Sequence, residues 1–379
     1  MVSQNMININ EMISIIIPCR NEEHRISACL DSIVQFVIPE KVEVEILVVD
    51  GNSDDKTVEI VNGFSDKYPQ IRLMSNPDQI QSCGLNIGIR SAKGEYILRL
   101  DAHSQYPQNY LNLCHHTMKN TGADIVGGIV ITLPGNDSPQ ALLVQMITTH
   151  SFGVGNAYFR TKERNGPVDT VPFGFFHRAI FDQIGYFDER LVRNQDYEFN
   201  CRIRKTGGIV WSNPDIRIFY YNQTTLSQFL KKQFILEAPY NVFMWYLAPY
   251  TFKARHAITG IFTGFVICGL LLSIYYKLIL NIYCSVMVLY FALSLRASFQ
   301  QARRMQNWSQ LFILPFAFFS FHFVHGLGVL KGLIRLILRK SPVQKVKEPW
   351  PGARIYRVKL SNLKKLNGGD HDSYKEDRS

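Results

Sequence analysis

Apolar runs of strand length alternate with helix-like patterns through the first third of the chain. The strand-like runs cover residues 13–18, 42–49, 71–74 and 95–100, and the helix-like stretches cover residues 22–36, 55–67 and 79–92. This alternation predicts an α/β fold with a mostly parallel, doubly wound sheet, which binds ligands beyond the carboxyl ends of its strands. Asp50 and Asp101 directly follow two of these runs, so we expect both carboxylates at the ligand-binding edge.

The pattern becomes mixed between residues 168 and 208. An aromatic segment, VPFGFFHR, is followed by FDERLVRNQDYEFNCR, in which the stretch from Asp196 onwards predicts a helix. Turn and strand signals continue up to residue 225. We therefore expect one α/β domain over residues 1–225.

The character of the chain changes after residue 225. Within residues 226–256 we predict an amphipathic helix in a membrane surface, because apolar residues recur at helical spacing beside two lysines. The apolar face comprises Leu226, Phe229, Leu230 and Phe234, and the lysines are Lys231 and Lys232.

Three apolar runs follow within residues 257–337. Residues 257–276 form a run of 20 residues without a charge, and residues 278–295 form a run of 18. A helix needs about 20 apolar residues to span a bilayer, whereas buried helices of soluble proteins have apolar stretches of about 10–14 residues. We therefore predict two transmembrane helices. The third run, 311–330, contains Pro315, two histidines and two glycines, so it either spans the membrane or forms a broken, re-entrant segment.

Charge suggests how these segments are oriented. Residues 1–225 carry a net charge of −5 and residues 226–379 a net charge of +15. Basic segments tend to remain on the cytoplasmic side. Two spans with a re-entrant third segment would leave both the α/β domain and the basic tail, residues 338–379, in the cytoplasm, and we favour this multi-pass arrangement. The first residues have no secretory signal pattern.

Composition narrows the classes of partner. The basic half coincides with the long apolar runs, which suits a membrane surface better than nucleic acid, so we expect no nucleic-acid partner. The 7 cysteines form no CxxC pair and are expected to be reduced, buried thiols without zinc. The first strand-like run leads into CRNEEHR and not into GxGxxG, which argues against a dinucleotide site.

Four segments resemble the family 2 glycosyltransferases of the GT-A fold, and among these the membrane-attached enzymes of the succinoglycan glucosyltransferase type. The segments are SIIIPCRNEE (14–23), VVDGNSDDKT (48–57), GLNIGIRSAKGEYILRLDAHS (84–104) and NQDYEFNCR (194–202). The resemblance covers residues 13–235 and extends to the layout of the hydrophobic remainder. It implies an enzyme with a GT-A α/β domain.

The resemblance assigns a nucleotide pocket to the first two segments. Asp50 would bind the uridine of the donor, and Pro18, Arg20, Glu22 and Ser53 would line the same pocket. A carboxylate at the end of a strand can accept hydrogen bonds from a base or ribose. DGNSDD is also a favourable turn sequence, so Asp50 equally fits a turn, and Pro18 to Glu22 fit a strand end followed by a helix start.

The resemblance assigns a cation site to Asp101 and His103. The family carries a DXD motif here, which binds the ribose and a divalent cation that bridges the diphosphate of the donor. This chain has LRLDAHS, with histidine in place of the last aspartate. Imidazole suits transition metals better than magnesium, so we expect Mn²⁺ to be favoured over Mg²⁺.

Asp196 is the expected general base. By resemblance it occupies the acidic motif before the acceptor-side helix, and inverting transfer needs a carboxylate to accept the proton of the acceptor hydroxyl. Asn194 or Asp196 could also serve as the helix N-cap. Glu198 is a rival carboxylate, but a spacing of two residues directs it to another side of the helix. We also expect Phe173, Gly174, Arg178 and Arg202 to shape the acceptor pocket, because arginines bind phosphate or sugar oxygens. Ordinary surface charge explains these residues nearly as well.

The predicted function is therefore an inverting hexosyltransferase. The donor would be a nucleotide-sugar, UDP-linked by resemblance, and the acceptor a hydroxyl of a lipid-linked glycan, such as one on polyprenyl diphosphate, in bacterial-type exopolysaccharide or surface polysaccharide synthesis. Two alternatives remain: a transferase that uses a polyprenyl phosphate as acceptor, and a non-catalytic membrane scaffold with a nucleotide-binding fold. A processive synthase is disfavoured because no QxxRW follows the acidic motif.

Overall fold

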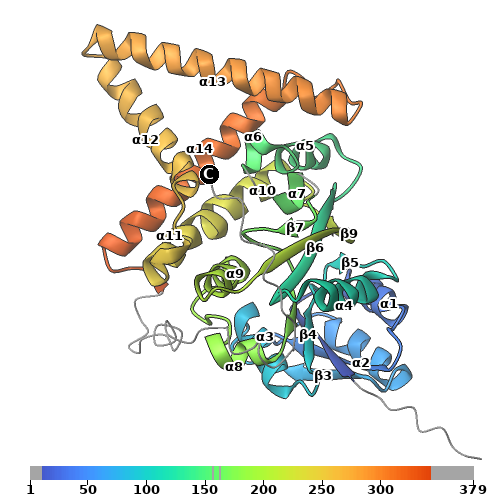
Figure 1. Ribbon diagram of the computed structural model, residues 1–379. Helices are drawn as coiled ribbons and strands as arrows, with labels where there is room; N and C mark the ends of the chain where they lie inside the picture. The colour runs from blue at the N-terminus through green and yellow to red at the C-terminus, as the bar shows by residue number, and fades with distance from the viewer. Residues whose placement is uncertain (1–10, 156–157, 162–163, 343–379) are drawn as a thin grey trace, which may run out of the picture.

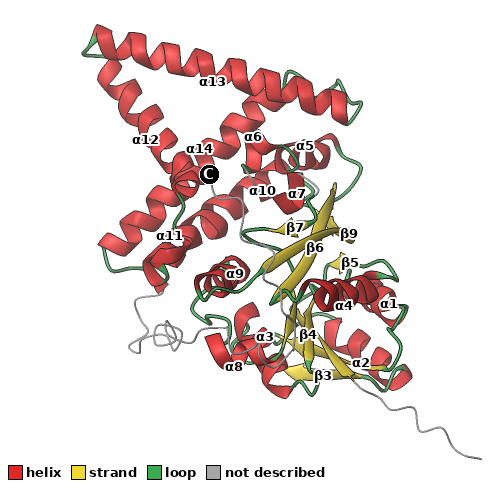
Figure 2. Cartoon of the chain, in the orientation of Figure 1, coloured by secondary structure: helices red, strands yellow, loops and turns green. Residues whose placement is uncertain are grey.

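The protein has an α/β domain followed by a group of long helices (Figure 1). The computed structural model describes residues 11–155, 158–161 and 164–342. In the secondary-structure view, the strands are confined to the α/β domain, and the C-terminal helices lie above and beside it (Figure 2). The GT-A fold expected from the sequence is confirmed by this architecture and by the structural comparison given below.

The sheet of the α/β domain combines a parallel half with a mixed half. The strand order is β3-β2-β1-β4-β8-β6-β9-β5, and β7 pairs with β9. Strands β1, β2, β3 and β4 are parallel, whereas β8 runs antiparallel between β4 and β6. The strands are β1 (Glu11–Cys19), β2 (Val42–Asp50), β3 (Ile71–Ser75), β4 (Tyr96–Arg99), β5 (Ser104–Gln105), β6 (Ile125–Leu133), β7 (Gly166–Pro167), β8 (Phe175–His177) and β9 (Val210–Tyr221).

The central strands are apolar on both faces because helices cover both sides of the sheet. In β1, Ile15 and Ile17 belong to one buried cluster and Ile16 to the other. Helix α3 packs so closely on β1 that a Cβ atom on Gly88 would lie 2.5 Å from Ile16 Cγ2. The helices of this domain are α1 (Ile26–Val34), α2 (Thr57–Lys67), α3 (Gln81–Ser91), α4 (Tyr110–Thr121), α5 (Pro139–Thr148), α6 (Ser151–Val154), α7 (Tyr158–Thr161), α8 (Ala179–Ile184) and α9 (Gln195–Lys205).

The C-terminal part begins with α10, which continues through a π-helical turn into α11. Residues Leu226 and Phe229 of the predicted amphipathic helix pack against α5 and α14 in one shared apolar cluster. The elements are α10 (Leu226–Lys232), η1 (Gln233–Glu237), α11 (Ala238–Leu247), η2 (Pro249–Thr251), α12 (Ala254–Ser273), α13 (Lys277–Arg304) and α14 (Leu314–Ile337).

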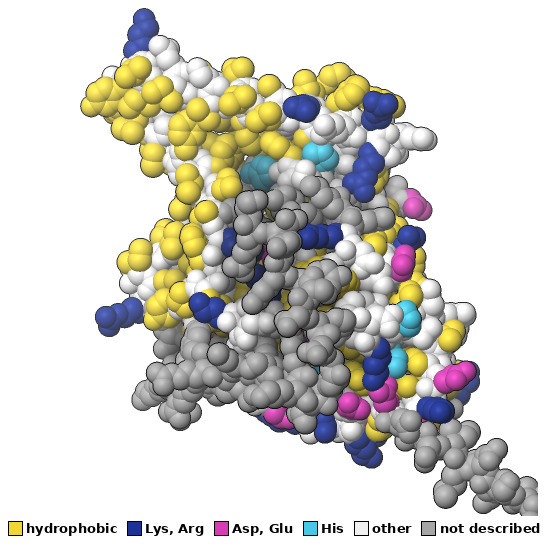
Figure 3. Space-filling model, viewed as in Figure 1, with side chains coloured by type: hydrophobic (Ala, Val, Ile, Leu, Met, Phe, Trp, Pro, Cys, Tyr) yellow, Lys and Arg dark blue, Asp and Glu magenta, His cyan; other side chains and the backbone are white. Residues whose placement is uncertain are grey.

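Three of these helices, α12, α13 and α14, are long and apolar enough to cross a membrane. In the space-filling view, hydrophobic side chains gather over α12 and α13, whereas the visible charged side chains are more frequent over the α/β domain (Figure 3). The second half of α13 differs from the first, because Ser294, Ser298 and Gln301 are fully buried. Gln301 Nε2 donates to the Met146 carbonyl and to Thr149 Oγ1, so this half is anchored on α5.

The third apolar run forms one continuous helix, α14, and not a broken segment. Pro315 lies in its first turn, where a missing N–H costs no helical hydrogen bond. Gly326 allows close approach to α12, since a Cβ atom there would lie 2.1 Å from the Thr259 carbonyl oxygen. His322 Nδ1 and His325 Nδ1 lie 2.8 Å from Tyr290 Oη and Thr259 Oγ1, respectively, so both imidazoles contribute to contacts between helices.

Candidate active site

The site lies where β1, β2 and β4 end side by side. Cys19 and Asp50 are register partners at the carboxyl ends of β1 and β2, and Asp101 follows β4, which pairs with the other side of β1. The sequence prediction that Asp50 and Asp101 share one edge of the sheet therefore agrees with the strand register.

The loops after β1 and β2 are joined by hydrogen bonds. The Asn21 N–H donates to Ser53 Oγ at 2.9 Å, and the Asp54 N–H donates to Asn21 Oδ1 at 3.0 Å. The Glu22 N–H donates to Thr57 Oγ1 at 2.8 Å. Asn21 has a φ of 54°, a left-handed conformation that asparagine tolerates better than most residues. These bonds hold the expected nucleotide pocket in one shape.

Asp50 takes part in the turn that the sequence suggested. Its carboxylate is buried and accepts hydrogen bonds from the Ser53 N–H, at 3.0 Å, and from the Ser53 hydroxyl. A carboxylate has further lone pairs beyond these bonds, so the turn leaves Asp50 able to accept from a ligand. Arg20 is exposed beside Gly51, and Pro18 is buried within β1.

Asp101 and His103 can share one cation. Asp101 Oδ1 accepts hydrogen bonds from Arg99 and Gln81, whereas Oδ2 lies 3.9 Å from His103 Nε2. That separation fits two ligands of one cation, each at about 2.1 Å. Glu22 Oε1 lies 3.1 Å from His103 Nδ1, and a proton on Nδ1 that is donated to this carboxylate would leave Nε2 able to coordinate a cation.

The two side chains do not enclose a cation by themselves. In the described part of the chain, no group of three or more His, Cys, Asp or Glu side chains is arranged to hold a metal. A cation at Asp101 and His103 would therefore take its other ligands from water and from the phosphates of a substrate, as magnesium sites in nucleotide enzymes do.

Arg99 connects the cation site to the expected base. Its side chain is 3% exposed, with Nη2 2.8 Å from Asp101 Oδ1 and Nη1 3.2 Å from Asp196 Oδ2. The guanidinium group also lies over the ring of Phe173, 4.8 Å from its centroid. Phe173 has a φ of 54°, a strained conformation for a bulky residue and one typical of functional sites. The fork of Arg99 thus fixes both carboxylates relative to each other.

Asp196, the expected base, is only partly buried. It lies in the first turn of α9, and its side chain is 30% exposed. Burial raises the pKa of Asp196, Arg99 lowers it and Asp101 raises it, so that the pKa stays above the ordinary value. A raised pKa makes a carboxylate a stronger base near neutral pH. Glu198, the rival, is buried in contact with Arg202 and Tyr250.

The N-cap alternative holds for the position of Asn194 but not for a side-chain cap. Asn194 is the N-cap residue, with a φ of 66°, but its side chain makes no capping hydrogen bond. Instead, Asn194 Nδ2 donates to Asn241 Oδ1 of α11 at 3.1 Å. The loop that carries the base is therefore tied to the helix that leads to the apolar segments.

Several residues of the site were missed by the sequence reasoning. Gln195 Nε2 donates to Gln81 Oε1 at 2.8 Å, and Gln81 in turn donates to Asp101. The Tyr106 hydroxyl accepts from the Asp101 N–H. Nothing in the local sequence marks these three. Arg99 had a signal, because it is a charged residue within the apolar run YILRL.

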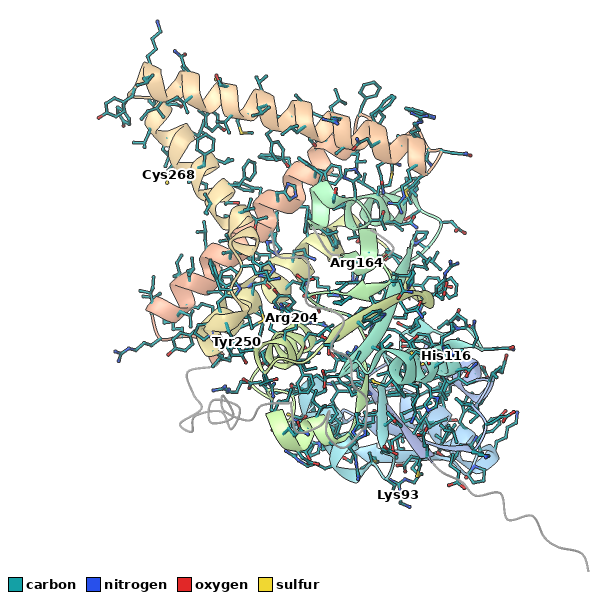
Figure 4. All side chains as sticks on the ribbon, in the orientation of Figure 1. Lys93, His116, Arg164, Arg204, Tyr250 and Cys268 are labelled. Carbon is teal, nitrogen blue, oxygen red and sulfur yellow. The ribbon has the colours of Figure 1, made fainter. Side chains whose placement is uncertain are left out.

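Two of the expected acceptor residues, Arg178 and Arg202, lie away from the site, so the prediction for them was wrong. Arg178 Nη1 donates to the Ala92 carbonyl at 2.8 Å, at the amino end of β4, because β8 runs antiparallel to β4. Figure 4 labels Lys93 at this end of the sheet, far from Tyr250 beside α9. Arg202 binds Glu198 and the carbonyls of residues 184–186, so its donors hold the α8–α9 connection.

The other two expected acceptor residues lie at the site. The Gly174 carbonyl accepts from the Arg99 N–H at 3.1 Å, and a Cβ atom on Gly174 would lie 2.4 Å from Ile125 Cδ1. Only glycine fits this close contact. Gly174 and Phe173 therefore both contact Arg99, Gly174 through its carbonyl and Phe173 through its ring.

Comparison with known proteins shows which family the α/β domain resembles. Residues 14–185 match the family model described as Glycosyl transferase family 2. The dolichyl N-acetyl-alpha-D-glucosaminyl phosphate 3-beta-D-2,3-diacetamido-2,3-dideoxy-beta-D-glucuronosyltransferase of Methanococcus voltae is 27% identical over 340 residues, which cover 85% of this chain and 97% of that protein. The succinoglycan biosynthesis protein ExoA of Rhizobium meliloti is 27% identical over 214 residues, 56% of this chain and 64% of that protein.

A solved structure supports the fold. The mannosyltransferase PcManGT from Pyrobaculum calidifontis, in complex with GDP-Man and Mn²⁺, superposes with a TM-score of 0.53 at 17% identity, covering 87% of this chain and 88% of that chain. At this identity the likeness concerns the fold alone. The matched model and the relatives therefore show a Glycosyl transferase family 2 domain over residues 14–185, and the solved structure supports the GT-A fold.

Proposed function

We propose that this protein is an inverting glycosyltransferase that transfers a sugar from a nucleotide-sugar to a hydroxyl of a lipid-linked glycan. One observation carries the proposal: Arg99 binds Asp101 on one side and Asp196 on the other. Direct displacement requires a donor site and a base on opposite sides of the reacting carbon, and Asp101 and Asp196 would fill these two roles.

The donor half of the site is proposed to bind a nucleoside diphosphate sugar, with UDP as the favoured nucleotide. Asp50, Ser53, Arg20, Pro18 and Glu22 would surround the nucleoside, because they lie on the two joined loops. Asp101 and His103 would hold a divalent cation, Mn²⁺ in preference to Mg²⁺. A bound cation supplies neutralisation of the charge that develops on the leaving diphosphate.

The acceptor half is proposed to work through Asp196. In a single step the acceptor oxygen forms a bond to the anomeric carbon, the bond from that carbon to the diphosphate breaks, and the hydroxyl proton passes to the Asp196 carboxylate. Arg99 keeps that carboxylate oriented, and its positive charge opposes protonation before the acceptor arrives.

The nature of the acceptor is inferred from the relatives and from the apolar helices. The Methanococcus voltae relative is named for transfer to a sugar carried on dolichyl phosphate, and it covers 85% of this chain. The Rhizobium meliloti relative is named for succinoglycan biosynthesis. Three helices are apolar enough to span a membrane, which suits an acceptor that is itself anchored in the bilayer, with the α/β domain on the cytoplasmic side.

Two other functions are less well supported. A transferase that uses a polyprenyl phosphate as its acceptor would need no base, because a phosphate oxygen is already a nucleophile, and the Arg99–Asp196 contact would have no purpose. A non-catalytic scaffold would not require a carboxylate with a raised pKa beside a second carboxylate on one buried arginine.

Asp196→Asn and Asp101→Asn test this assignment. Asparagine keeps the shape of Asp196 but cannot accept a proton, so turnover should fall about 10²–10⁴-fold with UDP affinity unchanged. Asp101→Asn should weaken nucleotide affinity as well as turnover. Asp182→Asn, at an exposed position of α8, is the matched control and should change neither. Near-normal turnover of Asp196→Asn would refute the base assignment and favour the polyprenyl-phosphate function.

A further inference from the structure

A cluster of charges lies where the α/β domain meets the apolar helices. Glu237 Oε1 lies 3.6 Å from Lys232 Nζ and 3.8 Å from Arg193 Nε. We refer to Arg193, Lys232 and Glu237 as the junction cluster.

The π-helical turn η1 brings Lys232 and Glu237 together. In an α-helix, residues five apart point about 140° away from each other, because one turn takes 3.6 residues. A π-helix bonds residue i to residue i+5 and places these two on the same face. Pro239 explains the wider turn, since it lacks an N–H and its ring crowds the carbonyl four residues earlier. Such turns occur frequently at functional sites.

The cluster has a surplus of positive charge. Two cations face one carboxylate, and both contacts are longer than hydrogen bonds. Arg193 Nε is buried and has no hydrogen-bond partner among the residues that the structure describes. The side chains of Lys232 and Glu237 are each 26% exposed, so water compensates only part of this charge. Partly buried cations without full pairing favour the binding of an anion.

The position of the cluster relates it to the site and to the membrane-type helices. Arg193 precedes Asp196 by three residues. Lys232 ends α10, whose apolar face packs against α14. An anion at the cluster would therefore lie between the base and the apolar helices.

We propose that Arg193 and Lys232 bind the phosphate of the lipid-linked acceptor, and that Glu237 is a resident counter-ion which this phosphate displaces. The inference rests on the proposed function and names the anchor of its acceptor. The planar fork of arginine binds phosphate oxygens in pairs, and lysine adds a point charge. The same chemistry could serve the diphosphate of the donor, and the experiment separates the two sources.

The test measures binding and turnover on the full-length protein in a neutral detergent. Binding of geranylgeranyl phosphate is compared with that of geranylgeraniol, and UDP affinity is measured in parallel. Arg193→Gln and Lys232→Gln should each weaken binding of the lipid phosphate about tenfold and leave UDP affinity unchanged. Lys231→Gln is the matched control, because Lys231 is the exposed neighbour of Lys232, and it should bind like the native protein.

Glu237→Gln should strengthen phosphate binding, a change that general damage to the fold cannot produce. Removing the counter-ion frees both cations, so lipid phosphate should bind about threefold or more tightly than to the native protein. Equal binding of the lipid phosphate to all four variants would show that the cluster is no phosphate site. A loss of affinity confined to UDP would show that the cluster serves the donor.

Turnover distinguishes failure of this inference from failure of the proposed function. With a sugar on polyprenyl phosphate as acceptor, Arg193→Gln and Lys232→Gln should raise KM about tenfold with little change in kcat. With the same sugar as a neutral octyl glycoside, they should match the native protein. If the native protein glycosylates neither acceptor but the binding results hold, the proposed function fails and the phosphate site stands.

Discussion

Replacing Arg99 by methionine should move the acidic limb of the pH–rate profile to higher pH. Burial raises the pKa of Asp196, while Arg99 lowers it. Arg99→Met removes the lowering influence, so the pKa of Asp196 should rise further above its ordinary value. At a given pH below the optimum, a smaller fraction of the base is then deprotonated, and kcat falls.

The size of the shift follows from the geometry. Unit charges about 4 Å apart interact by about 4 kcal/mol at an effective dielectric constant of about 20. The Asp196 side chain is 30% exposed, so water screens part of this interaction. Since about 1.4 kcal/mol corresponds to one pKa unit, we expect the limb to move by about one to two pH units.

The assay is kcat measured from pH 5 to pH 9 with saturating donor and acceptor, at a temperature where the variant remains folded. Folding must be checked separately, because removing one partner of a buried ion pair costs about 3–5 kcal/mol. Arg99→Lys keeps the charge and should move the limb less. Arg178→Met makes the same chemical change at the other end of the sheet and serves as control. A limb that stays in place or moves to lower pH in Arg99→Met would refute the proposed coupling.

Four further predictions follow from the structure. Glu22→Gln should raise the Mn²⁺ concentration that gives half-maximal activity about 10-fold or more, because the carboxylate orients His103; an unchanged cation titration would contradict this. Asn194→Gly should be tolerated in thermal unfolding because glycine adopts a φ of 66° readily, whereas Asn194→Val should lower the melting temperature. Gln301→Leu should destabilise the protein by about 1–3 kcal/mol, because it leaves the Thr149 hydroxyl and the Met146 carbonyl without their donor; an unchanged denaturant midpoint would argue against the anchoring of α13. A reporter inserted at residue 277 should score as external, and one fused after residue 379 as cytoplasmic; an external score for the second would favour three spans.

The sequence was sufficient for features that depend on local pattern. Alternating apolar runs and helical patterns predicted β1 to β4 and the helices between them within a few residues, because these elements bury continuous apolar faces. Strand ends are visible locally, so Asp50 and Asp101 could be placed at one edge of the sheet. The length of uncharged runs likewise revealed α12 and α13.

The tertiary structure decided which distant residues meet. Arg178 and Phe173 are five residues apart but lie at opposite ends of β8, and only the antiparallel insertion of that strand beside β4 shows which of them reaches the site. Arg202 pairs with Glu198 one turn earlier in α9, a spacing that the sequence shows. Only the packing of residues 184–186 against Arg202 shows that this pair is buried.

The contacts of Arg99 and of the junction cluster also depend on tertiary packing. Arg99 and Asp196 lie almost 100 residues apart in sequence, and they meet because the first turn of α9 reaches the side chain of the last residue of β4. Lys232 and Glu237 share one face only because the helix widens into a π-turn there. Periodicity within a segment specifies which residues are buried, whereas partners of buried charges depend on how separate segments pack, and this only the folded chain determines.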